Sequence, residues 1–338
     1  MKILYAIQGT GNGHISRARE IIPHLLNHGE VDLLVSGTQA EVNLPYLITY
    51  KKHGVGFTFG KKGGVDFSKS IKQLRPFNFA KDVLTFPVNK YNLIVNDFEP
   101  ITAWACKIQH KPCIALSHQA AFLSDKTPRP LKRIAISESI LKYYAPATQK
   151  IGFHFKSYDN FIHTPIIRSD VRQFETSNQG HITVYLPAHA DELLLNAFTC
   201  IRDIKWHVFS KHSKIAYQHK NIWVEPIESS QFLKSLAASD GLITAGGFES
   251  PAEALYLRKK LLIIPMLNQY EQICNAEALK EMGVTVIKRL DEQFVGRIRS
   301  WLNFSHPINV SYPNQTAKII EGLVDGNSYS PAKTELAF

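Results

Sequence analysis

One segment in the second half of the chain, residues 241–265, limits the possible folds more than any other. The apolar run 241–245 is typical of a buried strand, and it leads directly into Gly246-Gly247. A helix is predicted to begin at Ser250-Pro251, because proline is favoured in the first helical turn, and the apolar run 261–264 predicts a second strand. A strand, a glycine turn, a helix and a strand in this order build a parallel sheet covered by helices.

The alternation of apolar runs and helical patterns continues over most of the chain. Strands are predicted at residues 3–7, 31–36, 56–59, 93–95, 113–116 and 133–136, and again at 182–186, 206–209, 222–224, 241–244 and 261–264. Helices fall between these runs, the first of them at residues 16–27. This pattern predicts the α/β class with parallel sheets.

The predicted strands form two sets, separated by a polar segment at residues 166–180. We therefore expect two doubly wound, Rossmann-like domains, residues 1–165 and 181–312, that face each other across a cleft, with the polar segment as linker. A closing helix is expected at residues 313–325, and a loose polar tail at residues 326–338.

Composition favours a globular protein over a disordered or membrane-spanning one. Of the 338 residues, 44% are hydrophobic and 20% are charged. No apolar run approaches the roughly 18 residues of a spanning helix, and no signal peptide precedes the first strand, so we expect a cytoplasmic protein. The net charge of +10 favours an anionic partner, such as a nucleotide diphosphate or a phosphate-bearing lipid surface. Lysines and arginines are scattered and no nucleic-acid motif is present, so no nucleic acid is expected.

A glycine-rich loop, Gly9-Thr10-Gly11-Asn12-Gly13-His14, follows the first predicted strand, where a doubly wound sheet binds ligands. Glycines at every second position, with His14 in place of the last glycine, exclude the dinucleotide-binding fingerprint. A lone glycine loop is weak evidence, because many turns need glycine only for its backbone freedom. An imidazole at a helix start, however, can orient a phosphate or a sugar hydroxyl, or carry a proton. We therefore take Gly11, Gly13 and His14 as candidate site residues.

The turn at Gly246 and Gly247 predicts a site for a diphosphate. Unpaired N–H groups at a helix start favour an anion, and Ser250 adds a hydroxyl donor. Glu253 can accept two hydrogen bonds from a ribose diol, although it could also be an ordinary acid favoured by the helix dipole. The strand that ends at Pro265 delivers further side-chain amides to the same edge of the sheet, where they could hold sugar hydroxyls.

These two motifs resemble those of the GT-B glycosyltransferases, specifically the group that contains the peptidoglycan N-acetylglucosaminyltransferase MurG and the monogalactosyldiacylglycerol synthases. The resemblance rests on the glycine loop ending in His14, and on the series Gly-Gly, Ser, Glu-Ala-Leu, Ile-Pro and Gln-x-x-Asn-Ala between residues 246 and 276. It extends over nearly the whole chain and is most specific from residue 240 to 283. It implies a glycosyltransferase of the hexosyltransferase type that uses a nucleotide-diphosphate sugar, with UDP as the expected nucleotide and no separate cofactor.

The resemblance also implies roles for single residues. Ser250 would lie near the donor phosphates, Glu253 would hold the ribose, and Gln272 and Asn275 would face the donor sugar. Ile227 would present its backbone to the uracil-like base. The implied acceptor is a glycan or a lipid-linked molecule, so we expect peripheral contact with the inner face of the plasma membrane.

Two missing motifs favour an inverting and metal-independent reaction. The Glu-x7-Glu pair of many retaining GT-B enzymes is absent, because Leu257 follows Glu249 at that spacing, and no Asp-x-Asp motif occurs where a metal would matter. Inversion requires a base that deprotonates the acceptor hydroxyl. The candidate bases follow predicted strands of the first domain, at the rim that faces the cleft: His14, Asp97, Glu99 and His118.

Each candidate base has a structural alternative. Asp97 could simply cap the helix that follows it, Glu99 could be a cap or solvated, and His118 could be a satisfied loop histidine. His14 has the strongest motif support, so His14 and Asp97 are the predicted catalytic residues. The aromatic stretch of Phe77, Phe79 and Phe86 is interpreted as a buried patch, with an acceptor or membrane contact as the alternative.

Two other function classes are compatible with these observations. A nucleotide-sugar epimerase would share the fold and the diphosphate site, but should place more acid and base groups around the sugar. A protein that binds polyanions without catalysis would account for the positive charge, and its binding should depend steeply on salt.

Overall fold

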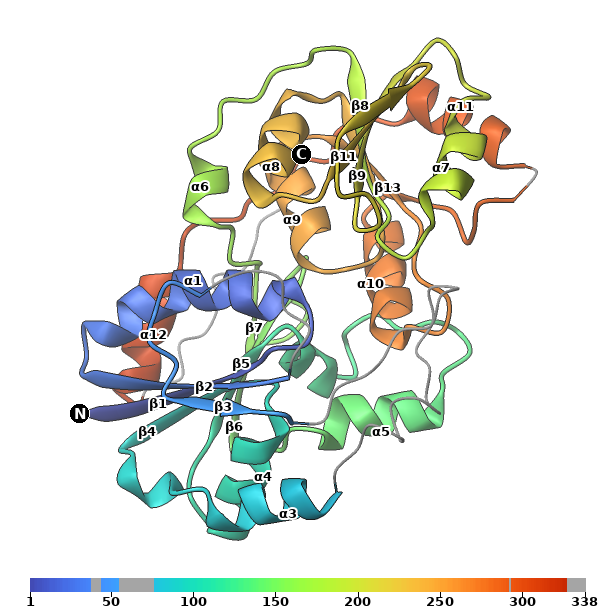
Figure 1. Cartoon of the computed structure of the whole chain (residues 1–338). Helices are drawn as coiled ribbons and strands as arrows, with labels where there is room; N and C mark the ends of the chain where they lie inside the picture. Colours follow the sequence, from blue (N-terminus) through green and yellow to red (C-terminus); the bar gives the residue numbers. More distant parts are fainter. Residues whose placement is uncertain (38–43, 55–75, 292, 327–338) are drawn as a thin grey trace.

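The computed structural model describes residues 1–37, 44–54, 76–291 and 293–326, and this part of the chain folds into two α/β lobes, each built on one sheet (Figure 1). Helices cover both faces of each sheet, and apolar side chains fill the layers between sheet and helices. The expected pair of Rossmann-like, parallel-sheet domains is thereby confirmed.

The first sheet is parallel throughout the described residues. Its strands are β1 (Lys2–Gln8), β2 (Glu30–Ser36), β3 (Tyr50–Lys52), β4 (Leu93–Asp97), β5 (Ile114–Ser117), β6 (Gln149–Phe153) and β7 (Ile162–His163). They lie in the order β3-β2-β1-β4-β5-β6-β7. The strand order reverses between β1 and β4, so the loops that follow these two strands open a crevice at the carboxyl edge of the sheet.

The second sheet repeats this plan. Its strands are β8 (His181–Tyr185), β9 (Lys205–Ser210), β10 (Tyr217–His219), β11 (Ile222–Pro226), β12 (Gly241–Thr244), β13 (Lys260–Ile263) and β14 (Thr285–Val286). They lie in the order β10-β11-β9-β8-β12-β13-β14, with the short edge strand β10 antiparallel to β11. Here the order reverses between β8 and β12, so the predicted diphosphate turn after β12 lies at the equivalent crevice.

The helices connect successive strands. In the first domain they are α1 (Asn12–Leu26), α3 (Pro76–Thr85), α4 (Pro100–Ile108) and α5 (Ala135–Tyr143), with 3-10 turns at Val88–Lys90 and Gln119–Leu123. Then follow α6 (Ser169–Arg172), α7 (Asp191–Phe198), α8 (Ser229–Ala238), α9 (Glu249–Tyr256), α10 (Tyr270–Glu281), α11 (Phe294–Phe304) and α12 (Thr316–Val324).

Helix α1 begins four residues earlier than its apolar pattern predicts. Its buried face includes Ile15, Ala18, Ile21 and Leu25, a spacing that places them on one side of a helix. Gly11 precedes the helix with φ of 100°, a conformation that glycine adopts without strain. The glycine loop is therefore short, and the predicted site residues after Gly11 belong to the first helical turn.

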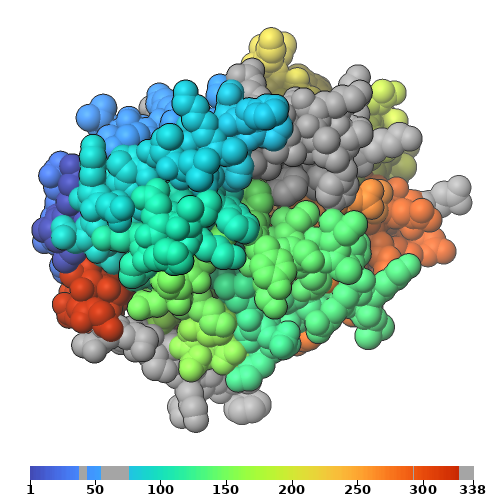
Figure 2. All heavy atoms as spheres, turned by 90° about the horizontal axis from the view of Figure 1, so that it is seen from below, coloured from blue at the N-terminus to red at the C-terminus, as the bar shows by residue number. Residues whose placement is uncertain are grey.

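The two lobes share one hydrophobic core and are joined by the carboxyl-terminal helix. Phe155 of the first domain packs against Phe248 of the second, with ring centroids 5.1 Å apart, and both belong to one cluster of buried side chains. Helix α12 packs on α1, so the chain returns to the first lobe at the end of the described residues (Figure 1). In Figure 2, α12 (red) lies at the surface beside the amino-terminal segment (blue).

Several local predictions need correction. The predicted strand at residues 133–136 is wrong, because α5 already begins at Ala135 and the preceding residues are irregular. Short runs such as Ile134-Ala135-Ile136 fit a strand or a helix equally well. The predicted aromatic patch is only partly buried, since Phe86 is 4% exposed while Phe77 is 89% exposed. The predicted strand at residues 56–59 lies outside the described residues.

Candidate functional site

His14 and Asp97 form a buried pair at the carboxyl edge of the first sheet. His14 lies in the first turn of α1, Asp97 ends β4, and the His14 Nδ1 atom lies 2.8 Å from Oδ1 of Asp97. Asp97 is completely buried and His14 is 9% exposed. Two of the predicted base candidates, 83 residues apart in the sequence, are thus in direct contact.

Arg17 holds the Asp97 carboxylate from the next turn of α1. Its Nε and Nη2 atoms donate to the two carboxylate oxygens of Asp97, over 3.0 and 2.8 Å. Burial by itself would raise the pKa of Asp97, but the positive charge of Arg17 and the contact with His14 outweigh it, and the pKa of Asp97 lies below its ordinary value. Asp97 is therefore an anion at neutral pH.

The third donor of Arg17 reaches the other domain. Arg17 Nη1 donates to Oε1 of Glu249, the first residue of α9, over 2.6 Å. Burial, followed by the neighbouring carboxylates of Glu253 and Asp97, raises the pKa of Glu249 to about 8 although Arg17 acts against this rise. The hydrogen bond between Arg17 and Glu249 connects the start of α9 to the start of α1. The two helix starts are also closely packed, because a Cβ atom at Gly13 would lie only 3.3 Å from Glu249 Oε1.

Three consecutive residues at the end of β4, Asp97, Phe98 and Glu99, have different structural roles. Glu99 caps α4, because its carboxylate accepts hydrogen bonds from the backbone N–H groups of Ile101 and Thr102 over 2.8 and 2.7 Å. Asp97 makes no such cap and is free to bind Arg17. Between them, Phe98 adopts φ of 55°, which is uncommon for a bulky side chain. Glu99 is therefore the cap of α4, and the capping alternative for Asp97 is excluded, while its catalytic role stays a prediction.

His118 joins the two domains. Its ring stacks on Phe248 with centroids 3.9 Å apart and planes 7° apart. Its Nδ1 and Nε2 atoms lie 2.8 Å from the Phe153 carbonyl oxygen and 2.9 Å from Oδ1 of Asn275. Burial lowers the pKa of His118 to about 4, so the ring is neutral at physiological pH. A neutral ring has one N–H group, which donates to one of these two acceptor oxygens, and His118 occupies a structural position between the domains, in line with its alternative interpretation.

The predicted donor residues around β12 form one tightly bonded loop. Gln272 Oε1 accepts hydrogen bonds from the backbone N–H groups of Gly246 and Met266, over 3.2 and 3.0 Å. Asn275 is fully buried and donates to the Gly246 carbonyl oxygen over 3.1 Å. Both amides therefore fix the glycine turn after β12, and the start of α9 that follows it has no side-chain cap at Phe248.

Glu253 is held by a residue of the linker. Arg168 donates from Nε and Nη2 to the two carboxylate oxygens of Glu253, over 2.6 and 3.0 Å, and from Nη1 to Ser229. Burial raises the pKa of Glu253, while Arg168 opposes the rise. The ribose role of Glu253 stays a prediction, and each carboxylate oxygen keeps a second lone pair beside its bond to Arg168.

The remaining predicted residues lie on loops at the same sheet edge or on α9. Ile227 follows β11 and donates its backbone N–H to the Ser210 carbonyl oxygen over 2.9 Å. Ser250 lies in the first turn of α9, and Gly247 precedes that helix with no atom within 4 Å of a Cβ placed on it. A side chain would therefore have room at Gly247. At Gly246 it would not, because a Cβ atom there would lie 2.6 Å from the Gln272 backbone.

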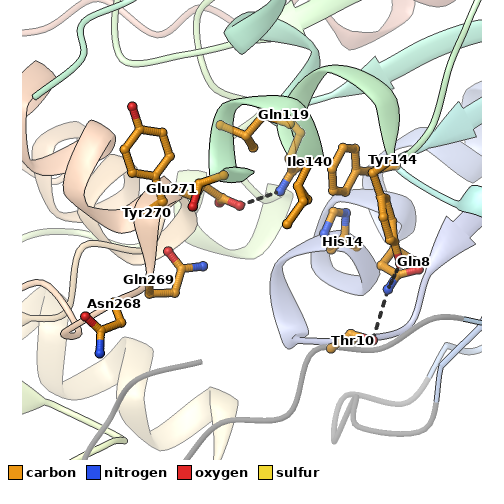
Figure 3. Close-up of a pocket in the computed structure, with 13 residues that line it drawn as sticks. Gln8, Thr10, His14, Gln119, Ile140, Tyr144, Asn268, Gln269, Tyr270 and Glu271 are labelled. Atoms are coloured by element: carbon orange, nitrogen blue, oxygen red, sulfur yellow. Dashed lines mark hydrogen bonds between the residues drawn. The ribbon is translucent and has the colours of Figure 1, made fainter. Parts of the chain in front are cut away.

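A cavity of about 130 Å³ opens beside His14, between the two domains (Figure 3). Gln8, Thr10, His14 and Tyr144 lie on one side of it, and Asn268, Gln269 and Tyr270 lie on the other. Gln119 and Glu271 are joined by a hydrogen bond of 3.1 Å and complete the lining where the domains meet. Both domains therefore contribute to the space that His14 faces.

Sequence reasoning missed three contributors to this site. Arg17 follows the glycine loop, three residues after His14, and that helical spacing was a usable signal. Arg168 and Tyr144 carry no local signal, because their partners come from distant parts of the chain.

Among the described residues, no group of three or more His, Cys, Asp or Glu side chains is placed to hold a metal ion. No described helix is long and apolar enough to cross a membrane.

Comparison with known proteins places this fold among the GT-B glycosyltransferases. The family model described as Glycosyl transferase family 1 matches residues 1–303, so the chain belongs to that family and is a glycosyltransferase. A comparison with curated proteins found no match.

Solved glycosyltransferases with the same fold cover nearly the whole chain. Arabidopsis thaliana UGT89C1 complexed with UDP is 14% identical with a TM-score of 0.57, and the match covers 97% of this chain and 96% of that one. Streptomyces sp. SF2575 SsfS6 complexed with thymidine diphosphate is 13% identical with a TM-score of 0.53, over 95% and 99% of the two chains. Acinetobacter baumannii MurG is 11% identical with a TM-score of 0.51, over 98% and 96%.

Proposed function

We propose that this protein transfers a sugar from a nucleotide-diphosphate sugar, with UDP as the first candidate nucleotide, to an acceptor hydroxyl bound in the cavity beside His14. His14 acts as the general base, Asp97 orients it, and the reaction inverts the anomeric carbon without a metal ion. The observation that carries this proposal is the contact between His14 Nδ1 and Asp97.

That contact determines which nitrogen of His14 can accept a proton. Two groups face Nδ1: the ionised Asp97 carboxylate at 2.8 Å, which can only accept a hydrogen bond, and Arg17 Nη2 at 3.2 Å, which can only donate one. We take the shorter contact as the hydrogen bond, so that Nδ1 carries the hydrogen. The lone pair of the neutral imidazole is then on Nε2, on the opposite side of the ring from Asp97. Since His14 lines the cavity, Nε2 is the atom that an acceptor hydroxyl would reach. In other enzymes too, a buried carboxylate holds a catalytic histidine in the tautomer and orientation that it needs to accept a proton.

The other candidate bases are occupied by structural contacts. Glu99 is bonded to two backbone N–H groups, and the Asp97 carboxylate is bonded to Arg17 on both oxygens. Both His118 nitrogens face buried partners, and its low pKa disfavours proton uptake. His14 is the candidate that combines a lone pair with access to a cavity.

In the proposed reaction, the acceptor O–H bond breaks as its proton moves to His14 Nε2. The acceptor oxygen forms a bond to the anomeric carbon, and the bond from that carbon to the diphosphate oxygen breaks on the opposite face. Asp97 stabilises the imidazolium that forms. The negative charge on the leaving diphosphate would be met by the backbone N–H groups at the start of α9 and by Ser250, which is why no metal is required.

The acceptor and its location are part of the proposal. The likeness of the two motifs to monogalactosyldiacylglycerol synthases favours a lipid-linked acceptor. Apolar side chains at the start of α5 are exposed to solvent, with Leu131 fully exposed and Ile136 69% exposed, and they flank Lys132 and Arg133. Such a surface suits peripheral contact with an anionic membrane, which co-sedimentation with anionic and zwitterionic vesicles would test.

The donor half of the proposal is tested by calorimetry. UDP, TDP, GDP and CMP would be titrated into the wild type and into Glu253→Gln, which keeps the shape of the side chain but loses its charge. We expect one diphosphate to bind in the micromolar range and to bind about 10-fold more weakly to the variant. Failure of all four nucleotides to bind the wild type would overturn the proposal, and equal binding to the variant would remove the ribose role of Glu253.

A further inference from the structure

The backbone at Phe98 is held in a conformation that its side chain disfavours. Phe98, His110, Lys220, Arg258 and Asn268 are the non-glycine residues with positive φ among those the structure describes. Two of them, Phe98 at 55° and Asn268 at 63°, line the cavity beside His14, one from each domain. Asparagine tolerates this conformation, whereas for phenylalanine it is an outlier, and such strain concentrates at ligand sites.

Contacts of the neighbouring residues and of the Phe98 ring fix the position of Phe98 in the cavity wall. Its neighbours Asp97 and Glu99 are both fixed, one on Arg17 and the other at the start of α4. The Phe98 ring packs on Tyr144, with centroids 4.8 Å apart and planes 33° apart. Tyr144 is itself fixed, because its hydroxyl accepts a hydrogen bond of 3.2 Å from Gln8 Nε2. The aromatic pair is therefore a rigid platform next to His14.

Polar groups surround this platform. Gln119 is 6% exposed and lines the cavity, and its Oε1 atom has no hydrogen-bond partner although its Nε2 atom is bonded to Glu271. A buried carbonyl oxygen without a partner is costly, so a bound hydroxyl that donates to it after the Gln119 amide turns toward the cavity would be stabilised. Asn268 and Gln269 add further amides from the opposite wall (Figure 3).

From this arrangement we infer that the acceptor hydroxyl belongs to a sugar ring, which lays its apolar C–H face on Phe98 and turns its hydroxyls toward Gln119 and the amides of the α10 start. The inference rests on the proposed function, because it places the acceptor in the cavity that His14 lines. Phe98 is then the residue that selects a carbohydrate acceptor.

An alkyl chain or an aryl group fits this lining less well. Either could contact Phe98 and Ile140, but neither would supply hydroxyls for the amide and carboxylate side chains of the opposite wall. Polar groups left unpaired against an apolar ligand disfavour binding strongly. A pyranose ring offers an apolar face and hydroxyls at its edge in one molecule, which matches both parts of the wall.

Saturation-transfer NMR with the full-length protein tests this inference without any turnover. The probes are methyl glycosides of glucose, galactose, mannose, N-acetylglucosamine and N-acetylgalactosamine, with 1-butanol and p-cresol as alkyl and aryl comparators. The variants are Phe98→Asn, which accepts a positive φ but lacks the ring, Phe98→Trp, which restores an aromatic face, and Phe77→Ala as a control at an exposed phenylalanine. Each variant is first checked for the wild-type unfolding midpoint.

We expect at least one methyl glycoside to bind the wild type, with the strongest transfer to the C–H protons of one ring face. Phe98→Asn should weaken that binding about 10-fold, Phe98→Trp should largely restore it, and Phe77→Ala should leave it unchanged. Binding of the comparators without any glycoside, no binding of any glycoside, or equal glycoside binding by the wild type and Phe98→Asn would overturn the inference. A protein that binds a nucleotide but no glycoside contradicts only this inference, whereas one that binds glycosides but no nucleotide contradicts the proposed donor chemistry.

Discussion

Arg17 Nη1 donates a 2.6 Å hydrogen bond to Oε1 of Glu249, and this contact joins the first helix of one domain to the start of α9 in the other. The same guanidinium binds both oxygens of Asp97. One side chain therefore fixes the carboxylate that orients His14 and also sets the distance between the two domains at the candidate site. Changes at Arg17 should affect the stability of the protein as well as its chemistry.

Arg17→Met should lower the free energy of unfolding by about 3–5 kcal/mol, because it leaves the Asp97 carboxylate buried without a countercharge. Adding Asp97→Asn to this variant should recover part of the loss, since the neutral amide has no charge to compensate. Urea unfolding of the wild type, the two single variants and the double variant measures the coupling. If the double variant loses as much as the sum of the single losses, the two side chains do not act as a pair.

Glu249 should make the stability of the protein decrease between pH 6.5 and 9. Its pKa rises on folding from 4.5 to about 8, so the folded protein keeps a proton that the unfolded chain has already released. The stabilisation is complete below the unfolded pKa and is lost as the pH rises through the folded pKa. In Glu249→Gln the unfolding midpoint should decrease less over this pH interval.

This pH interval separates the effect of Glu249 on stability from that of His118. The pKa of His118 is lowered on folding from 6.5 to about 4, so His118 changes the stability only below about pH 6.5. Glu277→Gln, at a more exposed glutamate of α10, is the matched control and should keep the wild-type dependence on pH. A Glu249→Gln variant with the wild-type dependence would show that Glu249 titrates normally.

Gly246→Ala should destabilise the second domain more than Gly247→Ala. A Cβ atom at Gly246 would lie 2.6 Å from the Gln272 carbonyl oxygen, whereas none of the surrounding atoms lies within 4 Å of a Cβ at Gly247. Relief of that clash requires the backbone of the turn or of α10 to shift, at a cost of about 1–3 kcal/mol. Differential scanning calorimetry of both variants compares them, and equal midpoints would mean that the turn adjusts freely.

Much of the fold follows from local patterns in the sequence. The apolar runs predict most of the central strands, because strands buried on both faces, such as residues 3–7, are continuously apolar. Edge strands such as β3 and β14 contain three and two residues, too few to give a period. The run at residues 133–136 shows the same limit, since its apolar residues belong to the irregular segment and first turn of α5.

The site was predictable only where its residues follow a strand. His14 and Asp97 could be predicted to lie near each other because the carboxyl ends of parallel strands meet at one edge of the sheet, and the structure shows their contact. The contact between Arg17 and Glu249 could not be predicted, because these residues are 232 positions apart in the sequence and meet only through the packing of two domains. The same holds for Arg168 and Glu253, which are 85 residues apart. Neither pair has a local pattern that could reveal its partner.

The central claim, that His14 accepts the acceptor proton, is tested most directly by the rate of nucleotide diphosphate release from the nucleotide sugar that binds, with a methyl glycoside or water as acceptor. The account predicts that His14→Ala lowers this rate by about 10²- to 10⁴-fold and leaves the Kd of the nucleotide within about 3-fold of the wild type. His219→Ala, at an exposed histidine of β10, should keep both values. A His14→Ala enzyme that releases the diphosphate at the wild-type rate would contradict the account.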